Sequence, residues 1–281
     1  MREKAESFRA GPVENHRERE GGVLVYPVYS RRSGGLSVGI NLFPDRKSCS
    51  FDCPYCEVFP FSRDIAFSTT LMEEALENAL AGARAENIPV RDISFSGNGE
   101  PTLSPHFAGA LETAARARDR CAPEAALVLI TNGTGLLDDR RYAFLRDRAS
   151  DAAALRIWLK LDAGTPDWYA RMNRSAADFD RLTGRIRLFV TEAPADIQTM
   201  LCAINGRPPP PEEAAAWERL AVELAASGRV RSFQLYGKAR PAPEDPLAEA
   251  LPAAYLEARA ESLRGALEAA GVRAVPVTVF P

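Results

Sequence analysis

Hydrophobic positions along the chain follow two alternating patterns. Short apolar or alternating runs, typical of strands, lie at residues 23–29, 36–43, 92–95, 126–131, 155–161, 196–203, 230–236 and 272–279. Segments with the spacing of amphipathic helices lie at residues 69–85, 105–118, 138–148, 212–226 and 253–270. Apolar strands that alternate with helices are typical of a parallel sheet covered on both faces. Six or seven such units predict an α/β fold, a partial (β/α)6 TIM-like barrel with an N-terminal extension.

The beginning of the chain has a different pattern from the rest. Residues 1–22 are rich in charge and have no apolar centre, so we expect a charged N-terminal arm rather than a signal peptide. Its mixed Arg and Glu residues are typical of a solvated face, with a lid or docking role as the alternative. Residues 23–281 are expected to form one domain, since α/β barrels of more than 200 residues fold as a unit.

Composition and charge are those of an ordinary globular protein. The formal net charge of −3 does not indicate nucleic-acid binding by the surface as a whole, so a nucleic-acid partner is possible but not favoured. No apolar run approaches the roughly 18 residues that a membrane span requires. A long chain whose cysteines lack the pattern of a disulfide framework is expected in a reducing cytoplasm.

Three cysteines are concentrated in one short segment, at Cys49, Cys53 and Cys56. Structural zinc normally takes four protein ligands, yet there is no second Cys-x2-Cys pair, and His16 and His106 are isolated. A disulfide framework is typical of small secreted chains, which this is not. Three thiolates in a tight loop instead suit a 4Fe–4S cluster whose fourth iron has no protein ligand and is open to a small molecule. A structural zinc protein remains the alternative.

A second motif follows the strand predicted at residues 92–95. It contains Gly97, Asn98, Gly99 and Glu100, directly before a predicted helix. Glycines allow the backbone to approach a ligand closely, and backbone carbonyls together with the Glu100 carboxylate can accept hydrogen bonds from an ammonium group. The alternative is an ordinary strand–helix turn with a carboxylate near a helix N-terminus.

The spacing Cys-x3-Cys-x-Tyr-Cys resembles the signature of the radical S-adenosylmethionine (SAM) superfamily. The resemblance implies that SAM chelates the open iron through its amino and carboxylate groups. It further implies that an electron from the reduced cluster cleaves SAM to a 5′-deoxyadenosyl radical, which abstracts hydrogen from a substrate. Tyr55 would then lie against the adenine, and residues 97–100 would hold the methionyl amino group, with Asn98 in place of the first glycine of the superfamily's Gly-Gly-Glu-Pro element.

Other polar residues at strand ends belong to the same prediction. Asn132 follows one strand and is expected to bond ribose or carboxylate, and Asp162 follows another, where it can accept ribose hydroxyls or pair with Lys160. Gln198 shares one face of a buried strand with Cys202, so both are candidates for lining a cofactor or substrate cavity. Cys202 is a weak catalytic candidate, and a small core cysteine is the favoured alternative.

The motif at residues 96–103, the turn at 131–133 and residues 160–163 and 171–174 resemble, within the superfamily, the branch of the wyosine-type tRNA-modifying enzymes. That branch carries a second cluster on amino-terminal cysteines, whereas residues 1–48 here contain no cysteine. The substrate is therefore left open. A tRNA-modifying or RNA-binding protein and a glycyl-radical activase remain the alternative functions.

Cationic residues flank the cysteines along the sequence, at Arg31, Arg32, Arg46, Lys47 and Arg63. They could form a local basic patch that docks an acidic electron donor of the flavodoxin or ferredoxin type. Contact with nucleic-acid phosphates, or simple compensation of an anionic cluster, are the alternatives.

Lys238 and Arg240 follow the strand predicted at residues 230–236 and are candidates for binding an anionic substrate group. Lys238 is the second weak catalytic candidate. A structural surface role is the alternative for both residues.

Overall fold

The computed structural model describes residues 23–58, 60–151, 155–240, 242, 247–272 and 275–281. The predicted N-terminal arm, residues 1–22, lies outside the described residues. The chain divides into two compact units: unit 1 comprises the described residues of Met1–Ser48 and Pro60–Leu129, and unit 2 those of Cys49–Phe59 and Ile130–Pro281. The units are interleaved along the sequence, because the segment 49–59 belongs to unit 2 and lies between two segments of unit 1.

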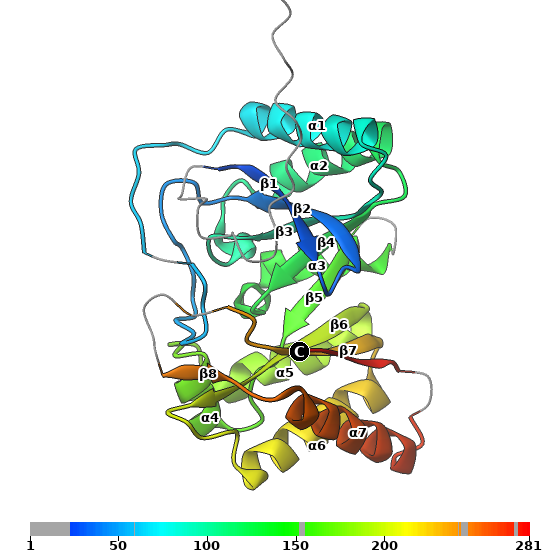
Figure 1. Ribbon diagram of the computed structural model, residues 1–281. Coiled ribbons are helices and arrows are strands. Elements are labelled where there is room, and N and C mark those ends of the chain that lie inside the picture. Colours follow the sequence, from blue (N-terminus) through cyan, green and yellow to red (C-terminus); the bar gives the residue numbers. More distant parts are fainter. Residues whose placement is uncertain (1–22, 59, 152–154, 241, 243–246, 273–274) are drawn as a thin grey trace, which may run out of the picture. The chain divides into compact units, whose positions relative to one another are not determined.

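Unit 1 is a sheet covered by two helices. Strand β1 (Val25–Ser30) runs antiparallel to β2 (Gly35–Asn41), and β2, β3 (Val90–Gly97) and the first part of β4 (Ala126–Thr131) are parallel. The helices α1 (Thr69–Ala85) and α2 (Phe107–Cys121), which connect these parallel strands, lie side by side (Figure 1).

The two faces of the unit 1 sheet differ in chemistry. In β2, Val38 and Ile40 are fully buried, and α1, which packs against this strand, buries Met72, Leu76 and Leu80 from one helical stripe. The alternate positions of β2 and β3 are small or polar, and Ser37 donates a hydrogen bond to Asp92 at 2.5 Å. The apolar face therefore accounts for the helix packing, and the other face is left polar.

Unit 2 is built on a second set of parallel strands, β5 (Arg156–Lys160), β6 (Ala195–Ile204), β7 (Val230–Gly237) and β9 (Val277–Phe280), hydrogen-bonded in that order. The short β8 (Ala248–Ala250) pairs antiparallel with β6. All residues of β6 are buried, as expected for a strand covered on both faces.

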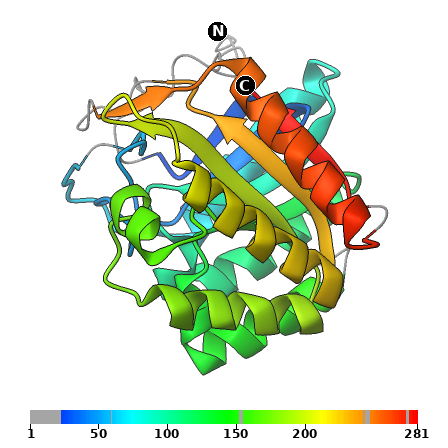
Figure 2. The same ribbon diagram turned by 90° about the horizontal axis from the view of Figure 1, so that it is seen from below.

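Five helices of unit 2 are described: α3 (Asp139–Ser150), α4 (Pro166–Met172), α5 (Phe179–Glu192), α6 (Pro211–Ser227) and α7 (Ala253–Ala269). The view from below shows α6 and α7 lying along the sheet, with α5 beside α6 (Figure 2). Short 3₁₀ helices, Pro101–Leu103 and Thr134–Leu137, follow β3 and β4.

Every strand and helix predicted from the sequence has an observed counterpart, with ends shifted by a few residues; the largest shift is that β9 begins at Val277. Five elements were not predicted: α4, α5, β8 and the two 3₁₀ helices. The mixed α/β class and the parallel pairing are confirmed. The count of six βα units in one barrel stays a prediction, since the strands belong to two compact units.

Candidate functional site

The cysteine loop, residues 49–56, belongs to unit 2. None of its three cysteines forms a disulfide; Cys49 is exposed, and Cys53 and Cys56 are half-buried. Within the described part of the chain, no group of three or more His, Cys, Asp or Glu side chains converges as ligands of one metal ion. In a cubane cluster each thiolate binds a different iron, so the sulfurs do not need to converge. Three thiols in one loop are a donor set that a cubane cluster can use.

Backbone and hydroxyl contacts hold the cysteine loop against the segment that follows α4. The Asp52 N–H donates to the Asn173 carbonyl at 2.9 Å, and the Ser175 hydroxyl donates to the Ser50 carbonyl at 2.9 Å. Within the loop, the Cys56 N–H donates to the Cys53 carbonyl at 3.0 Å and closes a turn. The chain path that presents the thiols is therefore fixed by residues more than a hundred positions away.

Asn132 follows β4 directly and is buried, with 4% of its surface exposed. Its amide nitrogen donates to the Ser50 hydroxyl at 3.0 Å and lies 3.7 Å from the Cys49 sulfur. Its carbonyl oxygen accepts from the backbone N–H and the hydroxyl of Thr134, at 3.0 and 2.8 Å. The predicted residue thus lies at the cysteine loop, where it contacts a thiol; its role toward ribose or carboxylate stays a prediction.

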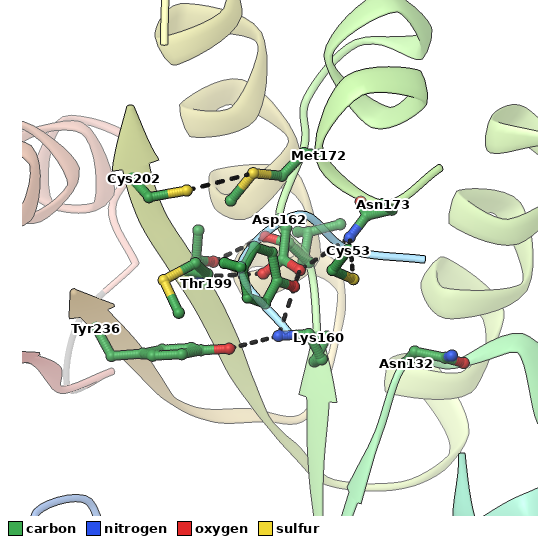
Figure 3. A network of polar contacts seen from close by, with 12 residues as sticks. Cys53, Asn132, Lys160, Asp162, Met172, Asn173, Thr199, Cys202 and Tyr236 are labelled. Atoms are coloured by element: carbon green, nitrogen blue, oxygen red, sulfur yellow. Dashed lines mark hydrogen bonds and ion pairs between the residues drawn. The ribbon is translucent and has the colours of Figure 1, made fainter. Parts of the chain in front are cut away.

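Asp162 lies at the centre of a buried polar network that begins just past the end of β5 (Figure 3). One carboxylate oxygen accepts from the Met200 backbone N–H at 2.9 Å. The other accepts from the Tyr55 hydroxyl and from the Asn173 amide, the latter at 3.0 Å, and lies 3.3 Å from the Lys160 ammonium. The sequence left open whether Asp162 binds ribose or pairs with Lys160, and the pairing is what the structure contains.

Lys160 is enclosed by aromatic rings as well as by the carboxylate. Its ammonium donates to the Tyr236 hydroxyl and lies 4.9 Å from the centre of the Tyr55 ring and 5.1 Å from that of Tyr236. Burial has the largest single effect on the pKa of this ammonium and lowers it, but the Asp162 carboxylate together with Tyr236 and Cys53 outweighs burial, and the pKa is raised. Lys160 therefore remains charged at neutral pH and balances the buried carboxylate.

Burial also governs the protonation of two neighbouring groups. It is the largest cause that raises the pKa of the Cys53 thiol to about 12 and the pKa of the Tyr55 hydroxyl well above its ordinary value. Without a metal, Cys53 is therefore a neutral thiol. A positive metal centre reverses this preference, because a coordinating thiol loses its proton. Tyr55 remains a phenol that donates to Asp162.

Gln198 and Cys202 lie on β6 but are held by protein contacts. The Gln198 amide donates to the Gln234 side chain on β7 at 2.7 Å. Cys202 is completely buried, its sulfur lies 3.7 Å from that of Met172, and burial raises the pKa of its thiol to about 12. These are the contacts of a core cysteine, the alternative that the sequence favoured. Lys238, the other catalytic candidate, is half-buried directly after β7.

The glycine loop, residues 97–100, belongs to unit 1, where Ser48 holds it. The Ser48 N–H donates to the Asn98 carbonyl at 3.0 Å, and the Glu100 N–H donates to the Ser48 carbonyl at 2.9 Å. Gly99 has a φ of +154°, and a Cβ there would stand 1.7 Å from the Ser48 carbonyl oxygen. Only glycine fits this position. The loop is therefore bound to the residue that directly precedes Cys49 in the sequence.

Glu100 is buried, with 2% exposed, and its carboxylate accepts from the backbone N–H and hydroxyl of Thr102, at 3.2 and 2.7 Å. It thus caps the 3₁₀ helix Pro101–Leu103. The proposed contact of Glu100 with an ammonium group stays a prediction.

The residues of the predicted basic patch fall into two groups. Arg31 and Arg32 lie in the turn before β2, whereas Arg46 and Lys47 come after its far end. Seven residues of strand separate the two pairs by about 23 Å, so Arg31 and Arg32 do not lie next to Arg46 and Lys47. The backbone at Arg63, in contrast, lies next to that at Arg46. Arg46 and Ser62 form an isolated antiparallel β-bridge, and the Arg63 N–H donates to the Asp45 carbonyl at 2.7 Å. Arg46 and Arg63 thus lie on neighbouring segments of unit 1, and a basic patch formed by them and Lys47 stays a prediction.

The sequence did not single out Asn173 or Tyr236 as site residues. Asn173 ends α4, and its amide contacts both Asp162 and the Cys53 sulfur, the latter at 3.8 Å. Tyr236 contacts Lys160 from β7. Asn173 lies in the segment 171–174 that contributed to the family resemblance, but nothing in that segment shows its contacts, because the partners of both residues lie far away along the chain. Alternation along β7 places Tyr236 on the same face as Gln234, which was the one available signal.

Comparison with known proteins gives short matches in sequence and long matches in fold. No family model matches the chain. A UPF0026 protein of Helicobacter pylori is 35% identical over 86 residues, which are 30% of this chain and 28% of that protein. A UPF0026 protein of Synechocystis is 29% identical over 194 residues, which are 62% of this chain and 63% of that protein. The chain thus matches less than two thirds of the length of either relative.

Two solved proteins share the fold. A radical SAM methyltransferase from Sphaerobacter thermophilus has a TM-score of 0.60 and 15% identity, and the match covers 90% of this chain and 67% of that one. Streptococcus suis SuiB, solved with SAM bound, has a TM-score of 0.64 and 13% identity, with coverage of 86% and 50%. An archaeal TYW1 has a TM-score of only 0.45, which gives no support for placing the chain in the wyosine branch. At these identities the likeness shows a shared fold.

Proposed function

We propose that this chain is a radical SAM enzyme in which Cys49, Cys53 and Cys56 bind a 4Fe–4S cluster. When bound, the cluster supplies the electron that cleaves SAM to a 5′-deoxyadenosyl radical, which abstracts hydrogen from a substrate still to be identified. The observation that carries the proposal is the loop of three thiols outside any disulfide, which contacts residues just beyond the carboxyl ends of β4 and β5. Ligands of α/β folds bind at that edge of the sheet. The fold shared with solved radical SAM proteins supports it.

The protein's own residues would bind and orient SAM and shield the site from water. The residues of unit 2 proposed to seat SAM are Tyr55, Asn132, Asp162 and Gln198. For the glycine loop of unit 1, residues 97–100, binding of the methionyl amino group stays the expectation from the sequence. Asp162 and Lys160 form a buried, charge-balanced pair next to the cysteine loop. Such a pair fixes the Tyr55 ring without adding net charge to the site. The protein's part is thus positioning and exclusion of water.

The test is anaerobic reconstitution with iron and sulfide, followed by product analysis. We expect a brown protein with about four irons per chain, and release of 5′-deoxyadenosine when SAM and dithionite are added. Changing Cys49, Cys53 or Cys56 to Ala should abolish this release, whereas Cys121→Ala, on α2 in unit 1, should retain it. A colourless, iron-free protein, or a Cys53→Ala variant that still releases 5′-deoxyadenosine, would contradict the proposal.

No described contact indicates whether the substrate is a tRNA, a partner protein that receives a glycyl radical, or another molecule. The tRNA-modifying and glycyl-radical activase functions are therefore both kept as alternatives. Within the described residues, no helix has both the length and the apolar character to cross a membrane.

A further inference from the structure

Asn132 has its amide orientation fixed by a partner on each side. Thr134 donates to the carbonyl oxygen through both its backbone N–H and its hydroxyl. A backbone N–H can only donate, so the oxygen must face Thr134 and the NH2 group must face the cysteine loop. There it donates to the Ser50 hydroxyl and faces the Cys49 sulfur at 3.7 Å.

Asn173 presents a second amide to a second sulfur. Its NH2 group donates to Asp162 at 3.0 Å with one hydrogen and faces the Cys53 sulfur at 3.8 Å with the other. A carboxylate can only accept from it, so the orientation of this amide is fixed as well. The side chain is 1% exposed, and the backbone carbonyl of the same residue accepts from Asp52 in the cysteine loop.

The sulfur of the third cysteine, Cys56, has a different kind of contact. The Cys56 sulfur faces the carbonyl oxygen of Val58 at 3.9 Å, which is an acceptor, and no side-chain amide among the described residues is within hydrogen-bonding distance of it. Two of the three thiols are therefore matched with buried NH2 donors from two different elements. Such matching is useful only when the sulfurs are negatively charged, because a neutral thiol is a weak acceptor.

We infer that Asn132 and Asn173 are positioning residues that donate hydrogen bonds to two thiolates of the proposed cluster and raise its reduction potential. The inference rests on the proposed function. Reduction adds a negative charge to the cluster, and NH2 groups aimed at its sulfurs stabilise the reduced state more than the oxidised one. Both amides are almost completely buried, so water does not screen them.

The test is the midpoint potential of the reconstituted cluster, measured in an anaerobic redox titration followed by electron paramagnetic resonance. Asn132→Ala and Asn173→Ala each remove one NH2 donor and should shift the potential to a more negative value. Asn132→Asp keeps the acceptor for Thr134 but replaces the donor with a carboxylate oxygen, so it should give a larger negative shift than Asn132→Ala.

Gln234→Met is the matched control, because it removes a buried amide that is hydrogen-bonded to Gln198 and has no described contact with a cysteine. It should leave the potential unchanged. Cluster-loaded Asn variants with the wild-type potential would overturn the inference while the proposed function stands. An equal shift in Gln234→Met would overturn it too, since the effect would then be general loss of packing. A wild-type chain that assembles no cluster overturns both. If Asn173→Ala does not fold, the two Asn132 variants decide.

Discussion

The Lys160–Asp162 pair depends on each partner for its stability. Asp162 has no exposed side-chain surface and Lys160 has 14% exposed. Taking two charges out of water is costly, and the attraction between them offsets that cost only while both are present. The hydrogen bonds from Tyr55, Asn173 and the Met200 backbone satisfy the remaining lone pairs of the carboxylate. The pair fixes geometry at the cysteine loop rather than adding net stability.

Replacing Lys160 with Met should destabilise the protein strongly, because it leaves the Asp162 carboxylate buried without its counter-charge. We expect a loss of about 3–5 kcal/mol in the free energy of unfolding, measured by urea denaturation. Arg187→Met is the control: its exposed pair with Glu223, at 2.8 Å, should contribute less than about 1 kcal/mol. Equal losses in the two variants would contradict the role of burial.

The pH dependence of this contribution follows from the raised pKa of Lys160. A cation whose pKa is higher in the folded state contributes its full stabilisation below its unfolded pKa, which is about 10.4 for lysine. The contribution is lost as the pH rises through the higher folded pKa. The stability difference between the wild type and Lys160→Met should therefore be constant from about pH 6 to pH 9 and decrease only in strongly alkaline solution.

Cys202 should resist alkylation in the folded protein. Burial, followed by the nearby Asp162 charge, raises the pKa of its thiol to about 12, so the reactive thiolate is scarce at pH 8, and the sulfur is also inaccessible. Timed treatment with iodoacetamide and peptide mass spectrometry would measure this. Cys121, which is half-buried at the end of α2, serves as the faster-reacting control. Rapid modification of Cys202 in the native state would restore it as a catalytic candidate.

At the scale of elements, hydrophobic periodicity was sufficient to predict a helix where the helix has a continuous apolar stripe. It failed for α5, although Leu182, Ile186 and Phe189 do form such a stripe. Gly184 lies within this helix, and α4 before it begins at Pro166 and is only seven residues long. These residues weaken the helical signal, so the packing of α5 against α3 and α6 decides its structure.

The glycine loop depends on one backbone position. Gly99→Ala would place a Cβ 1.7 Å from the Ser48 carbonyl oxygen, at a φ that other residues rarely adopt. The loop would have to move away from Ser48, and we expect destabilisation of about 1–3 kcal/mol. Under the proposed function, SAM affinity should also fall, which equilibrium dialysis with the reconstituted enzyme would measure.

Gly109→Ala is the matched control in the same unit. Gly109 lies in α2 with no atom within 4 Å of its would-be Cβ, so Ala should stabilise the helix by up to about 1 kcal/mol. If Gly99→Ala were as well tolerated as Gly109→Ala in thermal unfolding, the close approach to Ser48 would not matter.

At the scale of the whole molecule, the net charge of −3 includes three cations near the cysteine loop in the sequence, with Asp45 and Asp64 beside them. Arg46, Lys47 and Arg63 lie on the two chain segments that flank the cysteine loop, and the Arg46–Ser62 bridge joins those segments. The side chain of Arg46 is 73% exposed. Arg46 pairs with Asp45 at 3.0 Å, so docking of an acidic electron donor by these cations stays a prediction that salt dependence can test.

Reduction of the proposed cluster by flavodoxin should therefore slow as salt is added. Stopped-flow measurement should show a fall of about tenfold between low and high ionic strength. The double variant Arg46→Glu/Arg63→Glu should be slow already at low salt. Arg31→Glu/Arg32→Glu carries the same change of charge at the other end of β2 and should remain close to the wild type. Equal effects of the two double variants would point to net charge alone.

The sequence by itself determined the alternation of strands and helices, the three clustered cysteines and the glycine loop, because these depend on residues close together in the chain. The tertiary structure alone decided how side chains from distant segments meet. It paired Asp162 with Lys160 and Tyr55, directed Asn173 to Cys53, buried Cys202 and separated Arg32 from Arg46. Periodicity records which face of an element is buried, but the partner across that face is chosen by packing and by the need to satisfy every buried polar group.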